Sequence, residues 1–167
     1  MSKAFTKEDD TGDAPVRPRL VSPLPPGARN YLTPGGARRL REELARLAEV
    51  ERPAFLAQGA GAREELARVE QRIAYLEQSL RSAEVTAPPP PPHEVVRFGA
   101  RVTVRDPAGA ATTYQIVGVD EADADRHEVS WLSPIGRALL NARLGQKVPF
   151  RFPGGAALLE VVRIEYA

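Results

Sequence analysis

Residues 33–80, TPGGARRLREELARLAEVERPAFLAQGAGAREELARVEQRIAYLEQSL, decide the fold of the N-terminal half of the chain. Aliphatic residues recur here every three or four positions on both sides of a break at Gln58-Gly59-Ala60-Gly61, and Arg and Glu flank them. This spacing is typical of two helices that meet along a narrow apolar seam. Thr33 is a suitable N-cap and Pro34 suits the first helical turn, so the first helix is predicted to begin there.

The two predicted helices pair as an antiparallel hairpin. With a turn near residue 60, facing residues of a coiled coil have numbers that sum to about 120. The aliphatic positions that obey this rule are Leu40 with Leu80, Leu44 with Leu76, and Leu47 with Ile73. Arms of about 24 residues give a hairpin about 35 Å long at helical rise. Pro53 lies inside the first arm and is predicted to kink it or to remove one backbone hydrogen bond.

From Glu94 onward the hydrophobic period changes to two, which is typical of strands. The predicted strands, which are rich in Val, Ile, Tyr, Phe and Thr, are 97–105, 112–120, 126–132, 147–152 and 157–166. Ser133-Pro134 opens a short predicted helix that runs to Arg143 and that Gly145 closes. The expected fold class is therefore α+β: an N-terminal antiparallel two-helix coiled coil plus a C-terminal antiparallel sheet with one short helix.

The same patterns predict the domain organisation. Residues 1–30 have scattered apolar positions and no period, so we expect a disordered tail. The hairpin then occupies residues 31–86, a proline-rich linker residues 87–93, and the C-terminal domain residues 94–167. Five consecutive prolines make the linker stiff and extended, but they leave the orientation of the two domains open.

Composition excludes several functional classes. The chain has no cysteine, and no stretch is long and apolar enough to span a membrane. We therefore expect a cytoplasmic monomer without membrane attachment. His93 and His127 have no partners at ligand spacing, so no metal or other cofactor is expected. The acidic run 120–125 is interpreted as a solvated turn.

Charge also points away from autonomous, sequence-specific nucleic-acid binding. The 23 basic and 22 acidic residues are nearly balanced in every part of the chain, whereas DNA-binding domains gather Lys and Arg on one face. A small basic face is not excluded. A protein partner fits this balance better.

Eight short segments carry a resemblance to a known family: Tyr31–Gly36, Leu40–Leu44, Glu51–Pro53, Arg72–Leu76, Phe98–Ala100, Tyr114–Gly118, Ser133–Leu139 and Ile164–Tyr166. In this order they resemble the Gre family of bacterial transcription factors, and the opening Lys3-Ala4-Phe5 with the acidic Glu8-Asp9-Asp10 resembles the GreB side of that family. The resemblance implies an FKBP-like fold for residues 94–167 and bacterial RNA polymerase as the partner. It also implies that the coiled coil enters the secondary channel of the polymerase while the C-terminal domain grips the rim of that channel.

The resemblance further implies two sets of site residues. The polymerase-binding set is Leu132, Ser133, Pro134, Ile135 and Arg137. The hairpin tip is Gln58, Gly59, Ala60, Gly61, Glu64 and Glu65. In the family, acids of a Gly-Asp-x-x-Glu-Asn motif at the tip help to hold a catalytic Mg²⁺ that belongs to the polymerase, because hard Mg²⁺ prefers oxygen ligands.

This chain departs from the family pattern at both places. Between Pro53 and Ile73 it is shorter by about fifteen residues, which removes about 10 Å of hairpin at helical rise, and the tip has neither Asp nor Asn. Glu64 and Glu65 are interpreted as first-turn acids that complement the helix dipole. Before Ser133-Pro134, Leu132 stands where the family commonly has Asp or Asn. Strand alternation predicts that one of Trp131 and Leu132 is in the core and the other exposed.

The function predicted from the sequence is regulation of transcript elongation at the secondary channel without stimulation of transcript cleavage, and without intrinsic enzyme activity. Two alternatives stay open. One is an active cleavage factor that uses Glu64 and Glu65. The other is an FKBP-like peptidyl-prolyl isomerase, which requires a deep aromatic pocket, although most aromatic residues of the domain are needed for its core.

Overall fold

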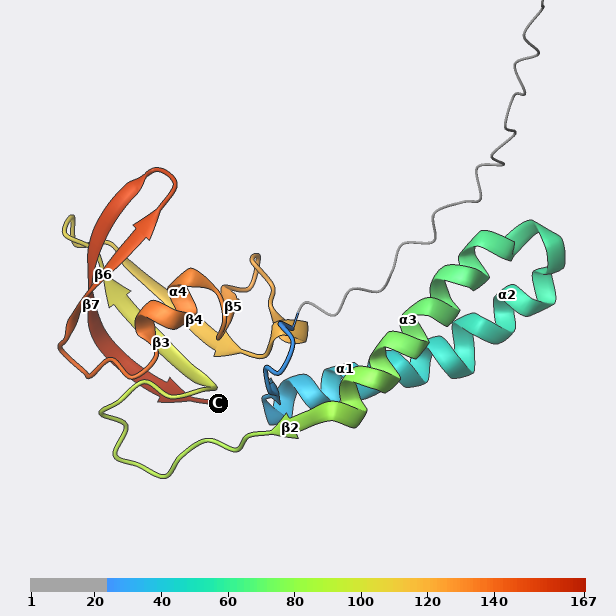
Figure 1. Ribbon diagram of the computed structural model, residues 1–167, viewed down its shortest axis with the longest axis horizontal. Helices are drawn as coiled ribbons and strands as arrows, with labels where there is room; N and C mark the ends of the chain where they lie inside the picture. The colour runs from blue at the N-terminus through green and yellow to red at the C-terminus, as the bar shows by residue number, and fades with distance from the viewer. Residues whose placement is uncertain (1–23) are drawn as a thin grey trace, which may run out of the picture.

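The structure, a computed structural model, describes residues 24–167; most of the predicted disordered tail lies outside the described residues. An elongated helical hairpin projects from a domain built around a sheet (Figure 1). Its helical elements are α1 (Pro34–Arg46), η1 (Leu47–Glu51), α2 (Arg52–Gln58), η2 (Gly59–Ala62), α3 (Arg63–Ser82), η3 (Val119–Glu121) and α4 (Pro134–Leu139). Its strands are β1 (Asn30–Leu32), β2 (Ala83–Val85), β3 (Ala100–Arg105), β4 (Ala111–Val117), β5 (Glu128–Ser130), β6 (Lys147–Phe152) and β7 (Gly155–Tyr166).

The hairpin pairs α1, η1 and α2 against α3. Its apolar seam holds the aliphatic residues that the sequence predicted to face one another: Leu40, Leu44, Leu47, Ile73, Leu76 and Leu80 all belong to one cluster or pack against it. Arg72 of α3 crosses the seam and donates two hydrogen bonds to Glu43 of α1, at 2.8 and 3.0 Å. The helix-type spacing therefore predicted that the two arms pack along these aliphatic residues.

Pro53 disturbs the first arm as its chemistry requires. The turn before it, η1, is a π-helix, in which the Arg52 N–H reaches back to the Leu47 carbonyl. Proline lacks an N–H, and its ring clashes with the carbonyl four residues earlier, so the wider turn accommodates it without breaking the arm.

The C-terminal domain has one five-stranded sheet in the order β5-β4-β3-β7-β6. The prediction of a purely antiparallel sheet is wrong for one pair, because β4 and β5 run parallel. The connection between them includes η3 and a further turn. It returns the chain to the end of the sheet at which the paired part of β4 begins, so that β5 can run in the same direction as β4. The core side chains include Val96, Val102, Ile116, Leu139 and Val161.

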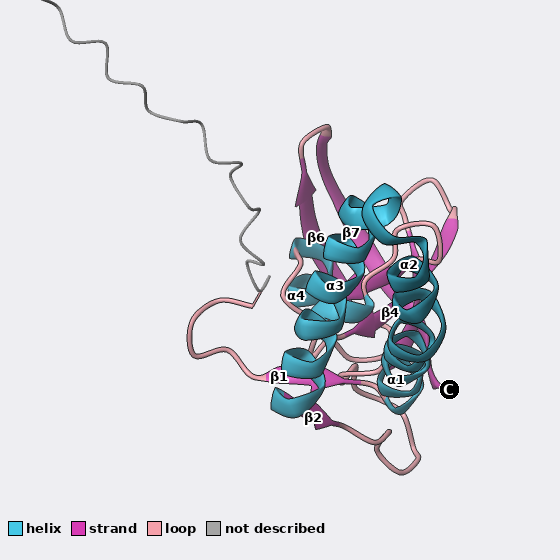
Figure 2. Ribbon diagram, turned by 90° about the vertical axis from the view of Figure 1, so that its right-hand side faces the viewer, coloured by secondary structure: helices cyan, strands magenta, loops and turns pink. Residues whose placement is uncertain are grey.

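The predicted helix 134–143 is too long. It ends at Leu139, because Leu140 leaves the helical conformation and Asn141 has a positive φ of 66°. The sequence reading also missed β1 and β2, two three-residue strands that pair in parallel at the base of the hairpin. Figure 2 shows this short sheet at the lower ends of the helices. Among residues 24–167, the helices are too short or too polar to cross a membrane.

Candidate functional site

The two predicted sets of site residues lie on different parts of the molecule. The tip residues are at the end of the hairpin far from the sheet, whereas the Ser133-Pro134 turn is on the C-terminal domain between β5 and α4 (Figure 1). A third region, the joint between hairpin and domain, determines how these two are held relative to each other.

At the Ser133-Pro134 turn, the serine has a structural task. Its Oγ accepts a hydrogen bond from the Gly136 N–H at 3.1 Å and donates one to the Ser130 carbonyl at 2.6 Å, so it caps α4. Pro134 and Pro34 have the same role in their helices, α4 and α1: each occupies the first helical turn, directly after a residue whose hydroxyl caps the helix. Pro134 itself is exposed, which makes it available to a partner.

The other predicted binding residues differ in exposure. Arg137 is exposed, whereas Leu132 is half-buried and Ile135 packs against the core. The expectation that Trp131 and Leu132 divide into core and surface is wrong, because both are half-buried. Strand β5 ends at Ser130, so the two residues belong to a turn and strand alternation does not apply to them.

The tip is a compact turn with an exposed outer surface. Gln58, Gly59, Ala60 and Gly61 are all exposed, and Gly59 closes α2 with φ 66° and ψ −135°. Glu64 and Glu65 lie in the first turn of α3 and are exposed, and Glu64 pairs with Arg68 at 3.8 Å. This placement matches the interpretation of both residues as acids that complement the helix N-terminus.

Sequence reasoning missed the joint, which depends on two neighbouring carboxylates of η3. Glu121 is only 6% exposed. It accepts hydrogen bonds from the Thr33 N–H at 2.9 Å, from the Thr33 hydroxyl, and from the Gly118 N–H at 2.9 Å. A carboxylate of the C-terminal domain therefore completes the N-terminus of α1, where negative charge is favoured.

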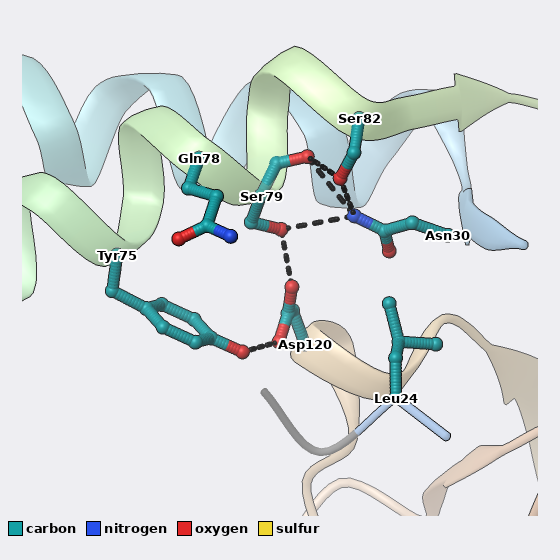
Figure 3. A pocket seen from close by; sticks show the side chains of 7 residues that line it. All are labelled: Leu24, Asn30, Tyr75, Gln78, Ser79, Ser82 and Asp120. Atoms are coloured by element: carbon teal, nitrogen blue, oxygen red, sulfur yellow. Dashed lines mark hydrogen bonds between the residues drawn. The ribbon is translucent and has the colours of Figure 1, made fainter. Parts of the chain in front are cut away.

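Asp120 extends the joint along α3. Its carboxylate accepts hydrogen bonds from the hydroxyls of Tyr75 and Ser79, and Asn30 donates to the Ser79 carbonyl at 2.9 Å (Figure 3). Burial, followed by the bond to Asp120, raises the pKa of Tyr75 above its ordinary value. These side chains enclose a small cavity of about 60 Å³. The interpretation of 120–125 as a solvated turn is therefore wrong for its first two residues.

Glycine permits the close approach at this joint. A Cβ on Gly36 would stand 1.7 Å from Glu121 Oε1, and a Cβ on Gly118 would stand 2.1 Å from the Tyr31 carbonyl oxygen. A glycine in the first turn of α1, where alanine is the better helix former, was the one sequence signal of a close neighbour.

Aromatic residues complete the joint on its other side. The Tyr31 ring lies 5.6 Å from that of Phe98 and 5.4 Å from that of Trp131, measured between centroids. The three rings line a hollow of about 540 Å³. Phe98 and Trp131 also pack against the core of the C-terminal domain.

The family model described as "Transcription elongation factor, GreA/GreB, C-term" matches residues 91–166. GreB of Neisseria meningitidis serogroup B is 34% identical over 154 residues, which cover 83% of this chain and 94% of that protein. The chain belongs to the GreA/GreB family of transcription elongation factors. GreA of Alkalilimnicola ehrlichii is 40% identical over 153 residues, covering 81% of this chain and 97% of that protein.

Solved structures of Gre factors also match this Gre-family chain. GreA factor homolog 1 of Thermus thermophilus is 30% identical, with a TM-score of 0.41, and the match covers 83% of this chain and 99% of that one. The GreA/GreB factor of Nitrosomonas europaea is 25% identical, with a TM-score of 0.43, over 83% of this chain and 100% of that one.

Proposed function

We propose that this elongation factor binds bacterial RNA polymerase at the secondary channel, with the hairpin directed inward and the Ser133-Pro134 turn on the rim. The observation that carries the proposal is the exposure of Pro134 on a turn that Ser133 holds rigid through two hydrogen bonds. Because such an exposed turn is already ordered before binding, a partner can bind to it without a loss of conformational entropy in the turn. Exposed Arg137, on the same short helix, adds a cation to this surface.

We further propose that the bound factor does not stimulate transcript cleavage. The tip offers Glu64 and Glu65 as carboxylates, and Glu64 already pairs with Arg68. The match to the Neisseria GreB supports a shortened chain, because its 154 aligned positions exceed the 83% of these 167 residues that they cover. Part of the relative therefore has no counterpart here, and we place this missing part between Pro53 and Ile73, where the sequence is shorter than the family pattern.

The test is a transcript-cleavage assay on backtracked elongation complexes, with the Neisseria GreB as the positive control. The expected result is no shortening of the RNA with this chain alone, and less GreB-stimulated cleavage when this chain is added in excess, because both occupy one channel. Shortening of the RNA by this chain would overturn the non-cleaving proposal. Loss of that shortening in a Glu64→Gln, Glu65→Gln variant would then identify the active-factor alternative.

The chain is also proposed to have no enzyme activity of its own. The observation that keeps the isomerase alternative open is the hollow lined by Tyr31, Phe98 and Trp131. Tyr31 comes from the N-terminal part and contacts both other rings, so the hollow depends on the joint and is not an independent pocket of the C-terminal domain. A tetrapeptide isomerisation assay on the full chain is expected to show no rate above background, and a clear rate would refute this.

A further inference from the structure

A second cleft at the joint carries a concentration of positive charge. It has a volume of about 440 Å³, within the range of small-molecule sites. Its walls come from three separate parts of the chain. Thr33, Arg38 and Arg39 are among the wall residues from the hairpin, Pro88 comes from the linker, and Arg101 and Arg126 are among those from the C-terminal domain.

The charge of this cleft is unbalanced. Four arginines face a single glutamate, Glu128, which leaves a formal excess of three positive charges, or two if a terminal carboxylate on Ala167 is counted. The chain as a whole has a net charge of only +1. A local excess of this size in a concave surface attracts anions, because the low-dielectric walls focus the field.

Glu128 holds two of the arginines side by side. Its side chain is 5% exposed, and its two oxygens take one guanidinium each: Arg39 Nη2 lies 3.2 Å from Oε2, and Arg126 Nη2 lies 3.2 Å from Oε1. One carboxylate cannot neutralise two guanidinium groups. The pair is therefore positioned in advance and still carries net positive charge.

The other two arginines are available to a ligand. Arg101 on β3 is exposed, and its side chain makes no ion pair or hydrogen bond with any described residue. Arg38 reaches Glu42 only at 4.0 Å, and both of these side chains are largely exposed, a pairing that contributes little. The dipole of α1 adds nothing to the argument, because Glu121 already lies at the N-terminus of that helix.

The lining also indicates the chemistry of the ligand. Guanidinium groups present forked donors that match phosphate oxygens, and several of them together favour an anion with several charges. None of the described residues that line the cleft is aromatic, whereas sites for single-stranded nucleic acid usually stack bases on aromatic rings. A small phosphorylated compound therefore fits better than an RNA strand.

We propose that this cleft binds the di- or triphosphate group of a small molecule through Arg38, Arg39, Arg101 and Arg126. Because the walls come from both the hairpin and the C-terminal domain, the bound anion joins the two and stabilises their contact. The site is separate from the Ser133-Pro134 turn, so it is tested without polymerase.

The experiment measures binding of inorganic tripolyphosphate to the full chain by calorimetry and by the thermal unfolding midpoint, at constant ionic strength. The variants are Arg101→Gln and the double change Arg38→Gln, Arg101→Gln, neither of which removes a contact that holds the joint. Arg41→Gln is the control, because it removes the same charge from an exposed position of α1 outside the cleft.

Tripolyphosphate is expected to raise the unfolding midpoint of the wild type. Arg101→Gln is expected to weaken binding about tenfold, the size of one lost charge-assisted hydrogen bond, and the double change to weaken it further. Arg41→Gln should stay within about twofold of the wild type.

Three results would overturn the proposal. The first is no binding to the wild type at millimolar tripolyphosphate. The second is an equal loss in Arg41→Gln, or an equal effect of sulfate, since either would reveal general attraction of anions rather than a site. The third is tighter, Arg101-dependent binding of a single-stranded RNA decamer, which would assign the cleft to RNA.

Discussion

The contact between Gly36 and Glu121 predicts that Gly36→Ala destabilises the wild type but not a variant that already carries Glu121→Ala. Glu121→Ala removes the acceptor of the Thr33 N–H, the Thr33 hydroxyl and the Gly118 N–H, all in a buried position. Each buried donor left without a partner costs about 1 kcal/mol or more, so the variant is expected to lose about 3 kcal/mol of unfolding free energy. Glu42→Ala removes an exposed carboxylate paired at 4.0 Å and should cost less than about 0.5 kcal/mol.

Gly36→Ala tests the same contact from the other side. The new Cβ would stand 1.7 Å from Glu121 Oε1 and 2.1 Å from Cδ, so the carboxylate must leave its place. The cost is then bounded by the loss of the hydrogen bonds of Glu121, about 3 kcal/mol. Glu121→Ala removes the three atoms nearest to this Cβ, and alanine is favoured over glycine in a helix by about 1 kcal/mol. Gly36→Ala is therefore expected to destabilise the wild type and to be neutral or stabilising in Glu121→Ala.

Urea unfolding of the wild type, both single variants and the double variant measures this coupling. The fluorescence of Trp131, the only tryptophan, reports on the joint because its ring contacts Tyr31, and circular dichroism reports on the helices. Additive costs, with the double variant about 6 kcal/mol below the wild type, would refute the reasoning. So would a Gly36→Ala variant as stable as the wild type.

Three further predictions concern the hairpin and the turn. Gly59→Ala places a side chain at φ 66° and ψ −135° and should lower the unfolding free energy by about 1–3 kcal/mol, whereas Gly61→Ala, an exposed neighbour with open space around its Cβ position, should not; urea unfolding compares the two. Arg72 donates to Glu43 and lowers the pKa of that carboxyl, so the pair contributes stability above the unfolded pKa and loses it as pH falls; Glu43→Gln should cost about 0.5 kcal/mol at pH 7 and nothing near pH 3, and an equal cost at both pH values would contradict this. Ser133→Ala removes the cap of α4 and should destabilise the domain by about 1 kcal/mol, which Ser133→Thr should largely restore if capping is its role.

The hairpin could be predicted because its information is local. Spacing alone indicates that apolar residues such as Leu40, Leu47, Ile73 and Leu76 line one face of each helix. The short turn between the two helices then leaves one simple way to pair these faces. The disturbance of the first arm at Pro53 could be predicted for the same reason, since the missing N–H and the ring clash do not depend on the rest of the fold.

The joint could not be predicted, because its meaning depends on residues distant in sequence. Asp120 and Glu121 stand in an acidic run that is indistinguishable from a solvated turn until Thr33, Tyr75 and Ser79 are brought beside it. The parallel direction of β5 was missed for a related reason. Alternation along Glu128–Ser130 shows that a strand exists but not which way it runs relative to β4.

The arginine cleft could not be predicted for the same reason, because its residues are distant in sequence. Arg38 and Arg39 are separated from Arg101 and Arg126 by about half the chain, and every segment that contributes one is close to neutral. Balanced composition therefore left a small basic face open but gave no sign of where it lies, and only the fold brings the four side chains to one cleft.

The measurement that tests the central claim most directly is binding of the chain to core RNA polymerase, compared between the wild type and Pro134→Asp. Aspartate is tolerated in the first turn of a helix, so this change alters the exposed surface of the turn while the fold is kept. Pro153→Asp, in the exposed turn between β6 and β7, is the control. We predict that the wild type and Pro153→Asp bind alike and that Pro134→Asp binds at least about tenfold more weakly; equal binding by all three, or no binding by the wild type, would contradict the account.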